Sequence, residues 1–220
     1  MRFVRIETFL GILAALSFFP AHAANASDDI LLESFHDPSH HWQQMNDPVM
    51  GGRSTGTFII DNGIGIFDGE VVDVPFLQAP GFIKVASRDH IAYPDVASCQ
   101  ALKLTLRSSV DYKGYRVSFG NAHPPHGKTF AYGFKSDLKV PKGNEFQEIE
   151  IPFTNFSDFW DDATGEQIKT CHDNPAYCPD VKTLHNMKTI SIWAEGVAGK
   201  AHLEIESISA SKCSENMNQS

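Results

Sequence analysis

The segment Leu102-Lys103-Leu104-Thr105-Leu106-Arg107 decides the fold class, because apolar and polar residues alternate along it without a break. A β-strand places successive side chains on opposite faces of its sheet, so this stretch has one face for a core and one for water. Parallel sheets are covered on both faces and tend to be apolar throughout, whereas antiparallel sheets show this alternation. The segment therefore predicts a strand of an antiparallel sheet.

The same alternation recurs along the rest of the chain. It is found in residues 148–153, 190–193 and 202–206. The other strand candidates are residues 30–35, 56–61, 64–72, 81–87, 114–119 and 129–135. Turn-forming residues separate these runs, and no stretch longer than about ten residues has a helical period. The pattern predicts an all-β fold, a two-sheet antiparallel β-sandwich of jelly-roll type. The irregular region 154–187 is expected to be a long loop.

The first 23 residues are expected to be a secretory signal peptide. Arg2 and Arg5 precede an apolar run of 11 residues, 9–19, and the small-residue motif Ala21-His22-Ala23 follows. The run is too short to span a bilayer, which takes about 20 apolar residues. A mitochondrial transit peptide is the alternative, but such peptides are amphipathic, whereas this run is apolar all round.

Removal of 23 of the 220 residues leaves 197, a plausible size for one all-β domain with a substantial core. We expect this domain at residues 28–212 and a C-terminal tail at 213–220. The loss of Arg2, Arg5 and Glu7 changes the net charge from −9 to −10. An acidic chain without basic blocks lacks the electrostatic footprint of a nucleic-acid binder. No other apolar run is long enough for membrane insertion.

All four cysteines follow the expected leader, which predicts two disulfides. Of the three possible pairings we favour Cys171–Cys178, which closes a short loop, and Cys99–Cys213, which ties the start of a strand to the chain end. A zinc site is the alternative, but the spacing contains no Cys-x-x-Cys pair. In a host that glycosylates, the chain is expected to be a glycoprotein. Its sequons begin at Asn25, Asn155 and Asn218.

The most informative segment is 41–54, HWQQMNDPVMGGRS. Asp47-Pro48 starts a turn because proline presets φ, and two glycines then permit conformations or close approaches denied to other residues. One interpretation is a packed corner whose polar side chains bond local backbone amides. The other is a recognition loop. Its partner-binding candidates are Trp42, Asn46, Asp47, Met50, Gly51, Gly52, Arg53 and Ser54.

This segment resembles the signature of the complex I intermediate-associated protein 30 family, in which a tryptophan precedes Asn-Asp-x-Val-Met-Gly-Gly-x-Ser. The similarity covers roughly residues 30–210. Weaker matches follow in the family's order at 66–71, 81–85, 115–119, 150–153 and 203–208. The resemblance implies a galactose-binding-domain-like jelly roll without catalytic residues. It also implies a protein partner, complex I assembly intermediates, and a mitochondrial location. The chain departs from the family in its leader, its cysteines and Pro80, which replaces a glycine.

The chain shows no recognisable catalytic motif. It contains neither a G-x-S-x-G elbow nor a Walker loop nor a dinucleotide-binding G-x-G-x-x-G. His36 and His40 have i, i+4 spacing, but Asp37-Pro38 between them disfavours the helix that a metal-binding pair would need. We therefore expect no cofactor and no metal ligands among these residues. A Ca²⁺ ion held by loop carboxylates would nevertheless suit the fold.

Three aromatic residues are ligand-binding candidates. Phe159 and Trp160 lie in an acidic segment, and Tyr177 lies inside the small cysteine loop. Ring faces beside carboxylates can hold a sugar by stacking and hydrogen bonding, although the rings can equally cap one end of the core. We expect a non-enzymatic protein-binding module, chaperone-like or assembly-factor-like, in the secretory pathway, outside the cell or in an organellar lumen. A secreted carbohydrate-binding module is the alternative, and an esterase or glycosidase is the third hypothesis.

Overall fold

The computed structural model describes residues 29–47, 51–89, 91–122, 133–161 and 164–214. Several predicted features lie outside these ranges: the signal peptide, Met50, the sequons at Asn25 and Asn218, and residues 129–132 of one strand candidate. Within the described ranges, no helix is long and apolar enough to cross a membrane.

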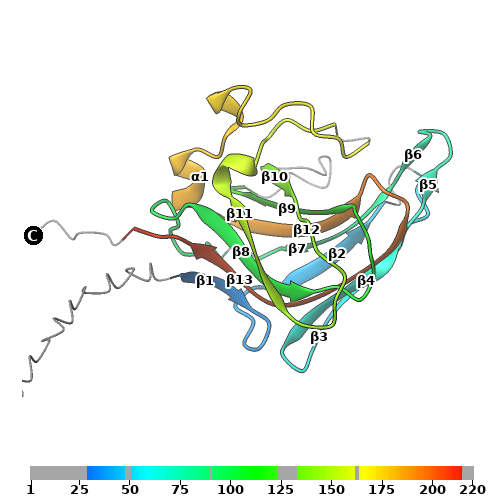
Figure 1. Ribbon diagram of the computed structural model, residues 1–220, viewed down its shortest axis with the longest axis horizontal. Coiled ribbons are helices and arrows are strands. Elements are labelled where there is room, and N and C mark those ends of the chain that lie inside the picture. Colours follow the sequence, from blue (N-terminus) through cyan, green and yellow to red (C-terminus); the bar gives the residue numbers. More distant parts are fainter. Residues whose placement is uncertain (1–28, 48–50, 90, 123–132, 162–163, 215–220) are drawn as a thin grey trace, which may run out of the picture.

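Two antiparallel sheets dominate the described residues, and Figure 1 shows them facing each other. Sheet A contains β1 (Ile30–Ser34), β3 (Thr55–Asp61), β4 (Ile64–Val71), β8 (Ala101–Arg107), β11 (Gln147–Pro152) and β13 (Gly199–Ser211). Sheet B contains β2 (Trp42–Asn46), β7 (Phe82–Ser87), β9 (Tyr115–Gly120), β10 (Phe134–Asp137) and β12 (Thr189–Glu195). The order in sheet A is β11-β8-β13-β4-β3, with β1 also paired to β13, and the order in sheet B is β10-β9-β12-β7-β2.

The core lies between the facing sides of the two sheets. Leu102, Leu104 and Leu106 of β8 are fully buried, and Val117 of β9 and Ile192 of β12 are buried in the same cluster. Each such side chain stabilises the fold by about 1.5–3 kcal/mol relative to exposure. The alternation along these strands thus puts one face in the core, and the predicted antiparallel sandwich is confirmed.

Three elements differ from expectation. The segment 42–46 was expected to belong to a corner, but it forms β2, which pairs with β7. Its sequence, WQQMN, has no apolar alternation because β2 is an edge strand with largely exposed glutamines. A small hairpin, β5 (Asp73–Val74) with β6 (Ala79–Pro80), projects at one end of the molecule (Figure 1). The irregular region contains η3 (Phe153–Asn155), η4 (Pro175–Tyr177) and the short helix α1 (Val181–His185).

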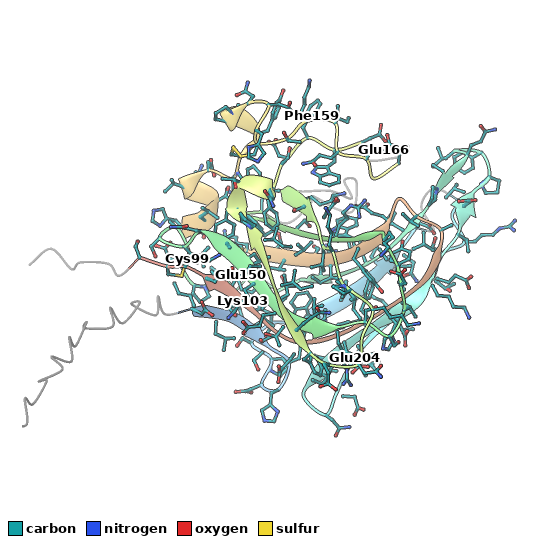
Figure 2. All side chains as sticks on the ribbon, in the orientation of Figure 1. Cys99, Lys103, Glu150, Phe159, Glu166 and Glu204 are labelled. Atoms are coloured by element: carbon teal, nitrogen blue, oxygen red, sulfur yellow. A yellow bond between two sulfur atoms is a disulfide. The ribbon has the colours of Figure 1, made fainter. Side chains whose placement is uncertain are left out.

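Both favoured disulfides are present, so the predicted pairing is confirmed. Cys99–Cys213 joins residues just before β8 and just after β13, 114 positions apart, and Figure 2 shows Cys99 at the end of the sandwich where β13 finishes. Closing a loop of that length contributes about 4–5 kcal/mol in the chain-entropy view. Cys171–Cys178 closes a loop of the irregular region.

Candidate functional site

The signature corner is built around one buried carboxylate. Asp47 follows β2 and is 1% exposed. Its Oδ1 accepts a hydrogen bond from Ser54 N at 3.1 Å, and its Oδ2 accepts from Ser54 Oγ at 2.8 Å and from Phe82 N at 3.1 Å. The Asp47 carbonyl accepts from Gly52 N at 3.2 Å. The chain therefore closes on itself between residues 47 and 54 and is tied to the start of β7.

The glycines of this corner are required for close packing. A Cβ atom on Gly52, which is half-buried, or on Gly81 would overlap the Asp47 carboxylate. Gly51 has a φ of +68°, in the left-handed region that side-chain-bearing residues rarely adopt. The Gly51-Gly52 pair and the Pro80-Gly81 turn thus belong to one structural unit, although about 30 residues separate them in sequence.

A second buried carboxylate holds the other end of β2. Glu33 of β1 is 1% exposed and accepts hydrogen bonds from Ser39 N at 2.8 Å, His40 N at 3.1 Å and Trp42 Nε1 at 2.8 Å. The Trp42 ring packs 5.3 Å from the Phe35 ring, centroid to centroid. Trp42 is therefore a core residue with a satisfied indole N–H.

Trp42, Asp47 and Ser54 were predicted as candidates for partner contact, but the structure places all three in the interior. Their polar atoms bond the chain itself, so these side chains hold the corner. The packed-corner interpretation accounts for them. The sequence did not distinguish these roles because the same short polar residues serve both.

Asn46, another candidate, caps the edge of sheet A. It is half-buried, and its Nδ2 donates to the Gly56 carbonyl of β3 at 3.4 Å. Gln44 acts in the same way, because its Oε1 accepts from Phe58 N at 2.9 Å. Edge strands leave backbone groups unpaired, and here side chains of β2 satisfy part of the edge of β3. Asn46 therefore helps to close the side of the sandwich.

The exposed part of the corner carries an aromatic side chain that the sequence analysis did not single out. Gly51 and Arg53 are exposed. Phe76, at the tip of the β5–β6 hairpin, is 66% exposed, and a Cβ atom on Gly51 would lie 3.3 Å from its ring. The signal was available in the sequence: an apolar Pro75-Phe76-Leu77 run stands in a turn, where polar residues are usual.

The outer face of sheet B carries a row of large polar and aromatic side chains. The strand register places Asp137 of β10, Arg116 of β9, Trp193 of β12, Lys84 of β7 and Met45 of β2 side by side. Trp193 is 1% exposed, although it faces away from the core between the sheets. This row is a second candidate site, and it was not predicted.

One ion pair in this region is buried. Lys135 Nζ lies 2.7 Å from Glu195 Oε1, and both side chains are buried. Lys135 Nζ also lies 4.7 Å from the Trp193 ring centroid and 5.0 Å from that of Trp160, while Lys84 Nζ lies 4.0 Å from Trp193. Burial, followed by repulsion from nearby cations, lowers the pKa of Lys84 to about 7. Perturbed groups of this kind mark candidate functional sites.

The three aromatic ligand candidates fall in two places. Trp160 is half-buried over Lys135, close to the row on sheet B. Phe159 and Tyr177 instead form a ring pair with centroids 5.3 Å apart on the irregular region. Sequence reasoning found Trp160 from composition but missed Lys84, Lys135 and Glu195. Lys84 and Glu195 stand at the positions of β7 and β12 that alternate with core residues and so face away from the core. This alternation is the sequence signal that could have found them.

A polar hollow of about 280 Å³ lies between the edge strands β10 and β11 and the irregular region. Its lining includes the polar side chains of Lys139, Asn155, Gln167 and His172, the carboxylates Asp137 and Glu150, and the apolar side chain of Ile149. Donors and acceptors are thus both available there to a small polar ligand. Within the described ranges, no three His, Cys, Asp or Glu side chains are arranged to hold a metal ion.

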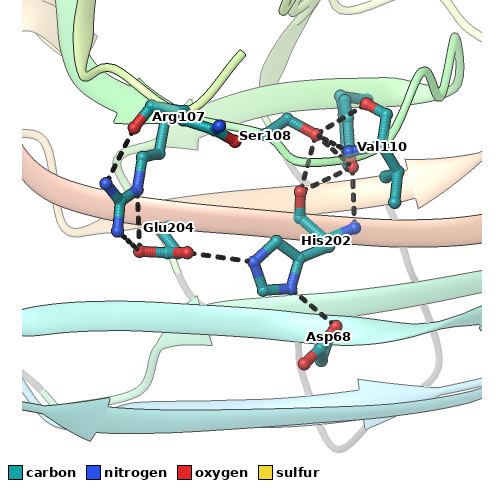
Figure 3. A network of polar contacts seen from close by, with 8 residues as sticks. Asp68, Arg107, Ser108, Val110, His202 and Glu204 are labelled. Atoms are coloured by element: carbon teal, nitrogen blue, oxygen red, sulfur yellow. Dashed lines mark hydrogen bonds and ion pairs between the residues drawn. The ribbon is translucent and has the colours of Figure 1, made fainter. Parts of the chain in front are cut away.

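The outer face of sheet A carries a different polar network, shown in Figure 3. His202 of β13 lies between two carboxylates, with Nδ1 2.8 Å from Asp68 Oδ1 and Nε2 3.2 Å from Glu204 Oε1. Arg107 of β8 donates to Glu204 Oε2 at 2.9 Å from Nε and 2.6 Å from Nη2. Burial opposes the charged imidazole, but its hydrogen bonds to Asp68 and Glu204 prevail and raise the pKa of His202.

Most of the chain matches one known protein family. The profile of the Complex I intermediate-associated protein 30 (CIA30) family matches residues 33–202, a range that includes the Asp47 corner. The chain belongs to this family. The CIA30 resemblance of segment 41–54 is thereby confirmed. Residues of the family signature form the corner around Asp47. No curated protein sequence matches the chain significantly.

Solved structures resemble this CIA30 chain in fold. The family 11 carbohydrate-binding module from Clostridium thermocellum, in complex with a β-1,3-1,4-mixed-linked tetrasaccharide, is 13% identical, with a TM-score of 0.57 over 87% of this chain and 100% of that one. The family 11 module of the cellulosomal cellulase Lic26A-Cel5E of Clostridium thermocellum is 12% identical, with a TM-score of 0.54 over 87% and 99%. At such identities the likeness establishes the galactose-binding-like sandwich alone.

Proposed function

We propose that the chain is a non-catalytic protein-binding module of the assembly-factor type, which binds unfolded or partly assembled protein. Phe76 carries this proposal, because a 66% exposed aromatic side chain packs on the family's signature corner. Large exposed aromatics are typical anchors of protein interfaces. Membership of the CIA30 family supports the same function, with complex I assembly intermediates as partners.

The outer face of sheet B supports this choice indirectly. A sugar-binding face needs an accessible ring flanked by free polar groups, but Trp193 is 1% exposed and Glu195 is paired with Lys135. Lys135 and Glu195 are thus used within the fold. Phe76, by contrast, offers an accessible aromatic ring at the corner.

Suppression of client aggregation tests the proposal. Wild-type protein at equimolar concentration should reduce the light scattering of thermally unfolded citrate synthase, and Phe76→Ser should lose most of this effect. Ile59→Ser is the matched control, because Ile59 is 56% exposed on β3 and should leave activity unchanged. No suppression by the wild type, or an equal loss in both variants, would contradict the proposal.

Carbohydrate binding is the second candidate, favoured by the polar hollow of about 280 Å³ between β10 and β11. Titration calorimetry with the mixed-linked tetrasaccharide bound by the family 11 module tests it. Saturable heat that disappears in Asn155→Ala with Gln167→Ala would establish a sugar site in the hollow. Absence of heat would leave the protein-binding function.

The compartment is part of the proposal. Two disulfides indicate a non-cytosolic environment. We propose the secretory-pathway lumen or the extracellular space, with the mitochondrion of the family relatives as the alternative. N-terminal sequencing of the mature protein tests this, because cleavage after Ala23 is expected for the secretory route.

A further inference from the structure

A cluster of exposed apolar side chains lies on the irregular segment that contains the Cys171–Cys178 disulfide. We name this the stapled segment, residues 154–161 and 164–180. Phe159 is 44% and Ile168 50% exposed, and Tyr177 is half-buried against the Phe159 ring. The Phe159 carbonyl accepts from Ile168 N at 3.1 Å, so the two exposed residues are neighbours. Three clustered apolar groups differ from the single exposed residues that are normal on protein surfaces.

The stapled segment is held rigidly under this cluster. Ser157 exchanges backbone hydrogen bonds with Lys135 of β10 at 2.9 and 3.0 Å, which adds the segment to the edge of sheet B. Ser157 Oγ donates to the Lys169 carbonyl at 2.6 Å, and Trp160 Nε1 donates to the Ser157 carbonyl at 2.9 Å. The exposed cluster is therefore preorganised, and a partner would not have to order it.

The charge on the stapled segment is predominantly negative. The described part of the stapled segment contains a single lysine, Lys169, and five acidic residues. The five are Asp158, Asp161, Glu166, Asp173 and Asp180. Figure 2 shows Phe159 and Glu166 on this segment. Such a surface attracts basic groups and repels acidic ones, including a second copy of this chain, whose net charge is −9.

We propose that the Phe159–Ile168–Tyr177 cluster binds an apolar polypeptide segment flanked by lysine or arginine. The apolar side chains of such a segment would cover the cluster, and its basic flanks would face the acidic residues. The inference rests on the proposed function and adds to the Phe76 corner a second client-binding surface, with a stated class of client.

Peptide binding tests the inference directly. A fluorescein-labelled peptide with a Leu-Phe-Leu-Leu core and two lysines on each side is titrated with the full chain, and anisotropy is followed. The same core flanked by glutamates is the matched probe. We expect the lysine peptide to bind at least about tenfold tighter, with a preference that declines as salt is added.

Substitutions test whether the peptide binds at the Phe159–Ile168–Tyr177 cluster. Phe159→Ser with Ile168→Ser should weaken the lysine peptide at least about tenfold, whereas Leu31→Ser, at a residue 56% exposed on β1, should not. Asp158→Asn with Glu166→Gln keeps the apolar cluster and should reduce the preference for lysine over glutamate. Thermal melts show whether each variant is folded.

Equal binding of both peptides, or an equal loss in the Leu31 control, would overturn the inference. These outcomes are distinct from failure of the proposed function. A wild-type chain that suppresses citrate synthase aggregation but shows no charge preference retains the function and loses this client class. A chain that suppresses nothing loses the function itself.

Discussion

The outer faces of the two sheets arise from the same sequence alternation, yet they hold charge in opposite ways. On sheet A, His202 and Asp68 form an ion pair whose side chains are 21% and 54% exposed (Figure 3). On sheet B, Lys135 and Glu195 form a pair whose side chains are 3% and 9% exposed. One network is partly exposed to solvent and the other is buried, although both lie outside the core between the sheets.

The stapled segment accounts for the difference. It pairs with β10 through Ser157 and places Trp160 over Lys135. Alternation in a strand determines which residues leave the core, but a segment distant in sequence determines whether they reach water. A polar residue on an outer face therefore has no fixed energetic role.

The largest expected effect is on the buried pair. Glu195→Gln leaves Lys135 charged, buried and without its carboxylate, which should lower the free energy of unfolding by about 3–5 kcal/mol. Glu204→Gln on sheet A is the matched control. It should cost about 1 kcal/mol or less, because Glu204 and its partners Arg107 and His202 are partly exposed to solvent. Urea denaturation at pH 7 measures both. Similar losses in the two variants would remove the distinction between the faces.

A compensated variant sharpens the same test. Lys135→Met combined with Glu195→Leu removes both charges together, and such replacements of buried pairs are often neutral or stabilising. The double variant should therefore recover most of the stability that Glu195→Gln loses. A double variant as unstable as the single one would mean that the pair acts through packing rather than through charge.

Raising the pH should stabilise the protein through sheet B. The pKa of Lys84 is lowered by burial to about 7, whereas the unfolded chain keeps the ordinary value of 10.5. Between these values the unfolded state binds more protons, so the free energy of unfolding rises with pH. From pH 7 to pH 9 the expected gain is about 2 kcal/mol.

Lys84→Met should abolish this rise, because methionine keeps much of the side-chain volume and does not titrate. Urea denaturation of both proteins at pH 7, 8 and 9 is the measurement. A wild-type profile that stays flat while the variant follows it would show that Lys84 titrates normally.

The fold was predictable because its signals are local. The alternation at 102–107 and the turns between strands identified ten of the main strands, and the loop closed by Cys171 and Cys178 was evident from spacing. β2 was missed because an edge strand such as WQQMN shows no alternation. Only residues 133–135 of the predicted range 129–135 are described; β10 begins there at Phe134 and extends to Asp137.

The candidate site was less predictable because it depends on distant contacts. The roles of Asp47 and Gly81 are set by a contact between residues far apart in the chain. Likewise, nothing local to Lys135 indicates that Glu195 and two tryptophan rings surround it. Single-sequence reasoning found Trp160 and Phe159 as aromatics in an acidic loop, but it did not show that Trp160 pairs with Gln167 in extended chain, which turns the two neighbouring rings to opposite sides.

The smallest expected effect has the opposite sign and belongs to sheet A. Hydrogen bonds to Asp68 and Glu204 raise the pKa of His202 above its ordinary value of 6.5 despite partial burial. Its stabilising contribution is therefore fully present below pH 6.5 and is lost as the pH rises through the higher folded-state pKa. Solvent screening limits the contribution to about 0.5–1 kcal/mol. The wild type should accordingly exceed His202→Gln in stability at pH 5.5 by more than it does at pH 8. A difference that grows with pH would mean that the imidazole is held neutral, and the two faces would then respond to protons alike.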